Sequence, residues 1–136
     1  PPEEAAECAH AMTANALDPI FLLAPTSTPE RIAQVAALAS GYVYYVSLKG
    51  VTGSAALNVT EVAEKLEQLR SVTDLPIGVG FGIRDGAAAA AVASVADGVV
   101  VGSVLVDQIA AHLGEPEQAR AAITAIIRDM RAAMDS

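Results

Sequence analysis

Two glycine-containing segments have the residue types and spacing to bind an anion. Gly78-Val79-Gly80-Phe81-Gly82-Ile83 is a short apolar run opened by Pro76, and Asp97-Gly98-Val99-Val100-Val101-Gly102-Ser103 is a valine run that ends in Gly-Ser. Each ends in glycine where a strand should give way to a helix, which in parallel α/β folds is where phosphate groups bind. The alternative is that these glycines only form tight turns and allow close packing. The two segments together favour a phosphate site.

Composition limits the kind of protein that could carry such a site. The 136 residues (13.8 kDa) suit one domain, and a net charge of −8 argues against nucleic acid as a partner. An anionic ligand must therefore be bound by backbone N–H groups and local dipoles. Cys8 is the only cysteine, which excludes a disulfide framework and a thiolate metal cluster. With no long apolar run and no basic leader, we expect a soluble, cytoplasmic protein without membrane contact.

The elements that would position the two segments alternate along the chain. Apolar runs predict strands over residues 19–24, 42–47, 76–80 and 97–101. Helical spacing and capping residues predict helices over residues 2–14, 29–40, 58–71, 85–95, 103–112 and 115–134. Asp85 and Ser103 are the expected N-caps of the fourth and fifth helices. Because Pro19–Ala24 is apolar on both faces, it indicates a parallel sheet covered by helices, and the order predicts right-handed βαβ units.

Two arrangements of the sheet fit this order of elements. One is an open, flavodoxin-like sheet, and the other is part of a (β/α)8 barrel, in which the last two strand-to-helix loops and a short extra helix bind phosphate. Glycines in the last two loops and a short helix after the fourth strand favour the barrel. Four strands are half of one. The loop over residues 48–57 is long and rich in small residues, so it could close over a ligand.

Three motifs carry a resemblance to a known family. Ser47-Leu48-Lys49-Gly50-Val51-Thr52-Gly53, Gly80-Phe81-Gly82-Ile83 and Gly102-Ser103, in this order, resemble the C-terminal half of the tryptophan synthase alpha subunit, and Asp18–Leu22 and the last helix fit the same family. The resemblance covers essentially the whole chain. It implies the C-terminal half of a (β/α)8 (TIM) barrel as a single domain over residues 1–136. It also implies a lyase of tryptophan biosynthesis, which cleaves indole-3-glycerol phosphate to indole and glyceraldehyde 3-phosphate by a retro-aldol reaction.

The resemblance assigns roles to individual positions. It implies that the substrate phosphate is bound by Gly53, Gly82, Gly102 and Ser103. It implies an indole pocket lined by Leu22, Tyr44, Phe81 and Val100, and a role for Thr52 in fastening the closed loop to a catalytic aspartate. No metal is expected. The family's partner is the beta subunit, in an α2β2 complex, and pyridoxal phosphate belongs to that subunit, so no cofactor is expected here.

The departure from the family concerns catalysis. The family's catalytic glutamate and aspartate lie in the N-terminal half of the barrel, and no position of this chain matches them. We therefore expect the catalytic carboxylates upstream of Pro1 and no lyase activity from these 136 residues alone. The alternative hypothesis is a catalytically inert phosphate-binding half barrel that self-associates to bury its open sheet edges. Barrels of the indole-glycerol-phosphate synthase type are a more distant alternative, which the Gly-Val-Thr-Gly loop argues against.

Overall fold

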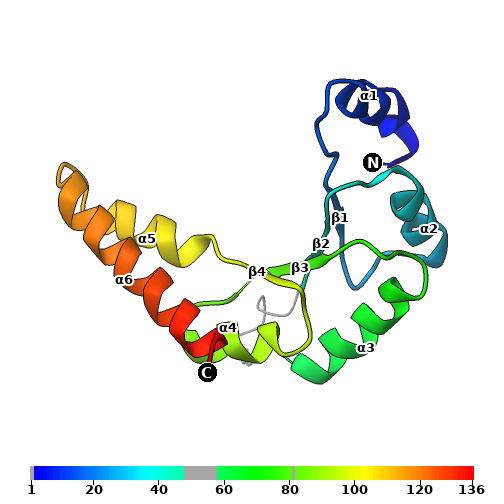
Figure 1. Ribbon diagram of the computed structural model, residues 1–136. Helices are drawn as coiled ribbons and strands as arrows, with labels where there is room; N and C mark the ends of the chain where they lie inside the picture. Colours follow the sequence, from blue (N-terminus) through cyan, green and yellow to red (C-terminus); the bar gives the residue numbers. More distant parts are fainter. Residues whose placement is uncertain (1, 48–57, 81) are drawn as a thin grey trace.

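The computed structural model describes residues 2–47, 58–80 and 82–136 and contains one parallel sheet with helices (Figure 1). In chain order the elements are α1 (Pro2–Ala14), β1 (Phe21–Leu23), α2 (Pro29–Leu38), β2 (Val43–Val46), α3 (Val59–Arg70), β3 (Ile77–Gly80), α4 (Gly86–Ala93), β4 (Gly98–Val100), α5 (Ser103–Ala111) and α6 (Pro116–Met134). The predicted alternation of strands and helices is confirmed.

The four strands lie side by side in the order in which they occur in the chain. The sheet order is β1-β2-β3-β4, and every pair is parallel. In a doubly wound sheet, the order in which the strands lie side by side reverses at a switch point. A strictly sequential order without such a reversal is the winding of a (β/α)8 barrel and argues against the flavodoxin-like alternative.

One face of the sheet carries the hydrophobic core. Buried strand side chains on this face pack with buried residues of α2, α3, α4 and α6, and helices surround it in an arc (Figure 1). The strand residues are Leu23, Val43, Tyr45, Ile77 and Val79. On the opposite face Leu22 is 55% exposed. The predicted parallel sheet thus has its helices on one face, and the second apolar face of these strands points to the interior side of the half barrel.

Side chains cap three of the helices that cover the core. Thr28, Asn58 and Asp85 precede α2, α3 and α4, and each accepts a hydrogen bond from a backbone N–H in the first turn. The prediction for Asp85 is confirmed, with 2.8 Å from the Ala88 nitrogen to Oδ1. The prediction that Ser103 caps α5 is wrong, because Gly102 is the N-cap and Ser103 is the first helical residue.

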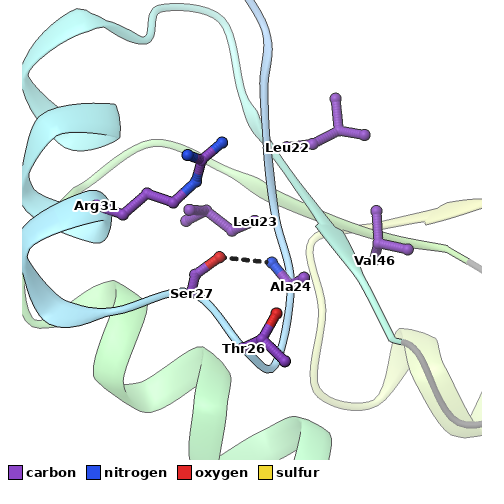
Figure 2. Close-up of a pocket in the computed structure, with 7 residues that line it drawn as sticks. All are labelled: Leu22, Leu23, Ala24, Thr26, Ser27, Arg31 and Val46. Carbon is purple, nitrogen blue, oxygen red and sulfur yellow. Dashed lines mark hydrogen bonds between the residues drawn. The ribbon is translucent and has the colours of Figure 1, made fainter. Parts of the chain in front are cut away.

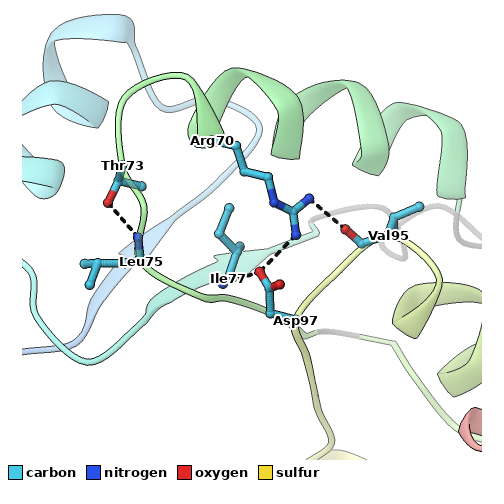
Figure 3. Close-up of polar contacts among 6 residues, drawn as sticks. All are labelled: Arg70, Thr73, Leu75, Ile77, Val95 and Asp97. Carbon is cyan, nitrogen blue, oxygen red and sulfur yellow. Dashed lines mark hydrogen bonds and ion pairs between the residues drawn. The ribbon is translucent and has the colours of Figure 1, made fainter.

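The amino-terminal end of the sheet is joined to α3 by Asp97 (Figure 3). Asp97 Oδ2 accepts hydrogen bonds from the Ile77 N–H and from Arg70 Nη2, both at 2.9 Å, and Arg70 Nη1 donates to the Val95 carbonyl at 3.0 Å. The bond from the Ile77 N–H and the guanidinium of Arg70 both lower the pKa of Asp97. This cluster lies at the end of the sheet opposite to the glycine-rich loops, so we assign it a structural role.

Candidate functional site

The two glycine segments meet at the carboxyl edge of the sheet. Gly80 of β3 pairs with Val100 of β4, so Gly82 and Gly102, each two residues further on, follow neighbouring strands at the same edge. Gly82 has φ +75°, a left-handed conformation that glycine adopts without strain. A Cβ added at Gly82 or Gly102 would meet no described atom within 4 Å. Among the described residues, none therefore blocks the approach of a ligand to the backbone at Gly82 and Gly102.

Helix α5 begins at this edge without a side-chain cap. The Gly102 carbonyl accepts hydrogen bonds from the N–H groups of Leu105 and Val106, at 2.9 and 3.2 Å, and among the described residues no side chain caps the first turn. Helix geometry leaves the N–H groups of Ser103 and Val104 without intrahelical partners. Helices α2, α3 and α4 have side-chain caps, whereas α5 and α6 have none. Of these two, α5 is the helix that directly follows a strand, so its N-terminus lies at this edge and is available to an external anion. Ser103 is exposed and adds a hydroxyl donor.

Predicted indole-pocket residues lie on the open face of the sheet. Leu22 pairs with Tyr44 in the β1–β2 register, and Val100 lies on the same face of β4. The Tyr44 ring covers Gly80, where a Cβ would lie 2.7 Å from its Cε2 atom. The structure thus brings Leu22, Tyr44 and Val100 onto one surface. The other predicted site residues, Gly53, Phe81 and Thr52, and the loop over 48–57 lie outside the described residues.

Tyr42 also lies on the open face, a placement that the sequence analysis missed. Its ring lies against Gly78, with 3.4 Å from Cε2 to the position of a Cβ there, and 40% of the residue is exposed. The period-two pattern of Tyr42 and Tyr44 in one strand could have revealed that they share a face. Tyr45 points to the opposite face, where it is 3% exposed, and burial, with a smaller contribution from Glu61, raises the pKa of its hydroxyl.

A hollow of about 450 Å³ opens where β1 and β2 end, next to Leu22 (Figure 2). Its walls combine apolar strand residues with polar residues of the loop and of α2. They are Leu22, Leu23, Ala24, Thr26, Ser27, Arg31 and Val46. Ser27 Oγ accepts a hydrogen bond from the Ala24 N–H at 3.0 Å, and Arg31 extends from α2 toward Leu23. The sequence analysis missed the polar part of this wall, because Thr26, Ser27 and Arg31 belong to no motif that it considered.

Ser47 fixes the end of β2 to the glycine segment. It is 4% exposed, and both its backbone N–H and its hydroxyl donate to the Gly80 carbonyl at 3.0 Å. Ser47 follows the strand that carries Tyr44, so these bonds join the end of that strand to Gly80.

The described carboxylates close to these loops have structural partners. Asp85, which follows the glycine segment, is the cap of α4. Glu30, in the first turn of α2, has its pKa lowered by hydrogen bonds from its own backbone N–H and from Thr28. Within the described ranges, no three His, Cys, Asp or Glu side chains could hold a metal ion, and no helix is long and apolar enough to cross a membrane.

Comparison with known proteins places this architecture in one family. The family model described as "Tryptophan synthase alpha chain" matches residues 1–135. Among curated proteins, the tryptophan synthase alpha chains of Marinobacter nauticus and Dechloromonas aromatica are 57% and 58% identical, over 100% and 99% of this chain and 50% of each relative. The chain thus spans about half the length of the curated relatives that it matches.

Solved structures agree with the sequence comparison. The alpha subunit of tryptophan synthase from Legionella pneumophila superposes with a TM-score of 0.82 at 36% identity, over 99% of this chain and 49% of the other. A tryptophan synthase chain from M. tuberculosis gives 0.78 at 35% identity, over 98% and 46%. The prediction of half a (β/α)8 barrel is confirmed by this likeness and by the four sequentially ordered parallel strands. The chain belongs to the tryptophan synthase alpha chain family.

Proposed function

We propose that this chain is the phosphate-binding, C-terminal half of a tryptophan synthase alpha chain, a cytoplasmic lyase of tryptophan biosynthesis. The whole protein would cleave indole-3-glycerol phosphate to indole and glyceraldehyde 3-phosphate by a retro-aldol reaction. Besides family membership, the observation that carries the proposal is the uncapped N-terminus of α5 beside Gly82. A nine-residue helix with free N–H groups at the carboxyl edge of a barrel sheet suits a phosphate group.

The phosphate would be bound by backbone rather than by a cationic side chain. N–H groups at Gly82, Gly102 and Ser103, with the Ser103 hydroxyl, converge on one edge, and Gly53 would add a fourth position from the loop. In a chain with net charge −8, such local dipoles supply the attraction that the overall field does not.

The indole ring would lie on the open face of the sheet. Leu22, Tyr44 and Val100, together with Phe81, provide apolar and aromatic surface, which suits a flat bicyclic ring. Tyr42 lies on the same face, so we add it to this set.

Carbon–carbon cleavage needs an acid and a base that these residues do not supply. We propose that the catalytic glutamate and aspartate belong to the other half of the whole protein, that Thr52 fastens the closed loop to that aspartate, and that this chain alone is inactive. The indole would pass to a beta subunit in an α2β2 complex. The retro-aldol step itself requires no cofactor in the alpha chain, since pyridoxal phosphate serves the beta subunit.

A titration with glycerol 3-phosphate tests the phosphate site. We expect the backbone amide NMR signals of Gly82, Gly102 and Ser103 to shift. Ser103→Asp should weaken binding at least about tenfold, because it places a negative charge on the anion site. Ser136→Asp adds the same charge at an exposed position outside the site and should leave binding unchanged. Unchanged binding in both Ser103→Asp and Gly82→Trp would refute the site. Lyase activity of the 136-residue chain would refute the placement of the carboxylates.

A further inference from the structure

We propose that the positive charge of Arg84 draws the phosphate group to the loops at Gly82 and Gly102, an inference that rests on the proposed phosphate site. Arg84 lies in the segment between β3 and α4, two residues after Gly82, and it is exposed. Because consecutive Cα atoms are about 3.8 Å apart, the Cα atoms of Arg84 and Gly82 are separated by at most about 7.6 Å. The backbone binds the anion in this arrangement, and the guanidinium adds a favourable field without having to touch it.

The position of Arg84 distinguishes it from the other cations that the structure describes. Those cations all lie on helices: Arg31 on α2, Lys65 and Arg70 on α3, and Arg120, Arg128 and Arg131 on α6. Arg84 instead follows a strand at the carboxyl edge of the sheet. It forms no hydrogen bond or ion pair with another described residue, so no such contact neutralises its charge.

Two carboxylates lie at the start of α4, where they would repel a phosphate group. Asp85 is the cap of this helix. Asp129 reaches the same place from α6, because a Cβ added at Gly86 would lie 2.9 Å from Asp129 Oδ2. The chain as a whole has a net charge of −8 and offers no compensating field. Arg84 therefore offsets a local repulsion as well as attracting the ligand, and its removal should be felt by a dianion more than by a neutral molecule.

Coulomb's law gives the size of the expected effect. For a unit charge on the order of 10 Å from a phosphate dianion in water, at an ionic strength of about 10 mM, it corresponds to about a threefold change in affinity. The Debye length falls from about 30 Å at 10 mM salt to about 3 Å at 1 M salt, so the effect should almost vanish at the higher concentration. A purely structural role for Arg84 would not show this dependence on salt.

Titration of the 136-residue chain with glycerol 3-phosphate at pH 8, where the phosphate is a dianion, tests the proposal. The amide NMR signals of Gly82 and Gly102 report binding, and circular dichroism verifies that each variant folds. Arg84→Gln should raise Kd about threefold at 10 mM salt and less than about 1.5-fold at 1 M salt. Arg84→Lys keeps the charge and should keep most of the affinity, because the proposed role needs a cation rather than a planar guanidinium.

Arg120→Gln is the matched control, because it removes the same charge from an exposed position farther from the site. Arg120 lies near the start of α6, and the nine residues of α5, about 13 Å of helix, separate that region from the anion edge (Figure 1). The Kd of this variant should change by less than about 1.5-fold at 10 mM salt.

The outcomes separate this proposal from the phosphate site on which it rests. If Arg84→Gln binds as tightly as the unchanged chain at 10 mM salt, or if Arg84→Lys binds no better than Arg84→Gln, the charge of Arg84 does not act on the ligand and the proposal is overturned. The phosphate site would still stand, provided that the signals of Gly82 and Gly102 shift. An absence of shifts in the unchanged chain would overturn both.

Discussion

The contact between Gly80 and Tyr44 makes a quantitative prediction. A Cβ at Gly80 would lie 2.7 Å from Tyr44 Cε2 and 2.9 Å from Cζ, with the hydroxyl oxygen closer still, whereas an ordinary contact begins at 3.4 Å. In Gly80→Ala the ring must therefore move by about 0.7 Å or more. We expect a loss of unfolding free energy of about 1–3 kcal/mol, the usual cost of overpacking. The displaced ring would also enter the space proposed for indole.

A double-mutant cycle isolates this contact. Tyr44→Ala removes the ring, and the added methyl group then meets no clash. In that background Gly80→Ala should be neutral or stabilising by up to about 0.5–1 kcal/mol, because it restricts the unfolded chain. The coupling free energy between the two positions, which is the difference between these two effects, should be about 1–4 kcal/mol. Gly98→Ala is the matched control on the same face, since its nearest neighbour is the Gly78 Cα at 3.9 Å.

Urea unfolding followed by far-ultraviolet circular dichroism provides the four free energies of the cycle, and the Gly98→Ala variant sets the baseline for a glycine-to-alanine change. If Gly80→Ala costs no more than Gly98→Ala, or if its cost is the same with and without the Tyr44 ring, then the ring is not held against Gly80. The steric requirement for glycine at this position would then be refuted.

Three further predictions concern the scaffold. Asp97→Asn should cost about 1 kcal/mol at neutral pH, a modest value because the ion pair with Arg70 is partly exposed and screened. The pKa of Asp97 is lowered from 3.8 in the folded state, so its contribution to stability is present above pH 3.8 and is lost as pH falls through the folded pKa. At a pH below the folded pKa, urea unfolding should therefore give the same stability for Asp97→Asn and for the unchanged protein. The pKa of Tyr45 is raised from 10.0, so stability should fall as pH rises above 10, and Tyr45→Phe should flatten that part of the pH profile. Asp85→Ala should cost about 1 kcal/mol by removing the cap of α4, whereas Glu117→Gln, in an exposed pair with Arg120, should change thermal stability by less than about 0.5 kcal/mol.

Local signals were sufficient to predict the elements of this fold. The predicted helix over residues 2–14 coincides with α1, and the helices that follow Thr28, Asn58 and Asp85 begin next to those capping residues. The helix predicted over residues 29–40 is shorter in the structure, where α2 ends at Leu38. Gly41, with φ +74°, lies in the turn that leads into β2. Capping is chemistry within one turn, which is why sequence could predict it.

Packing between distant segments was harder to predict. An apolar run such as Pro19–Ala24 shows that both strand faces avoid water, but not whether a helix or a barrel interior lies on each of them. The hollow beside Ser27 and Arg31 depends on how α2 lies against the end of β1, and nothing in the sequence around Pro29 records that arrangement.

The glycines show most clearly what sequence reasoning could not separate. The sequence analysis weighed an anion site against tight turns and close packing for the two segments taken together, and the structure divides the glycines by physical cause. Gly78 and Gly80 lack side chains beneath Tyr42 and Tyr44, whereas Gly82 takes a left-handed φ and Gly102 begins an uncapped helix. The first two therefore shape an aromatic surface, and only the last two lie where an anion could meet backbone N–H groups. Substitutions at Gly80 and at Gly102 should consequently affect different ligands: an aromatic ring in the first case, a phosphate in the second.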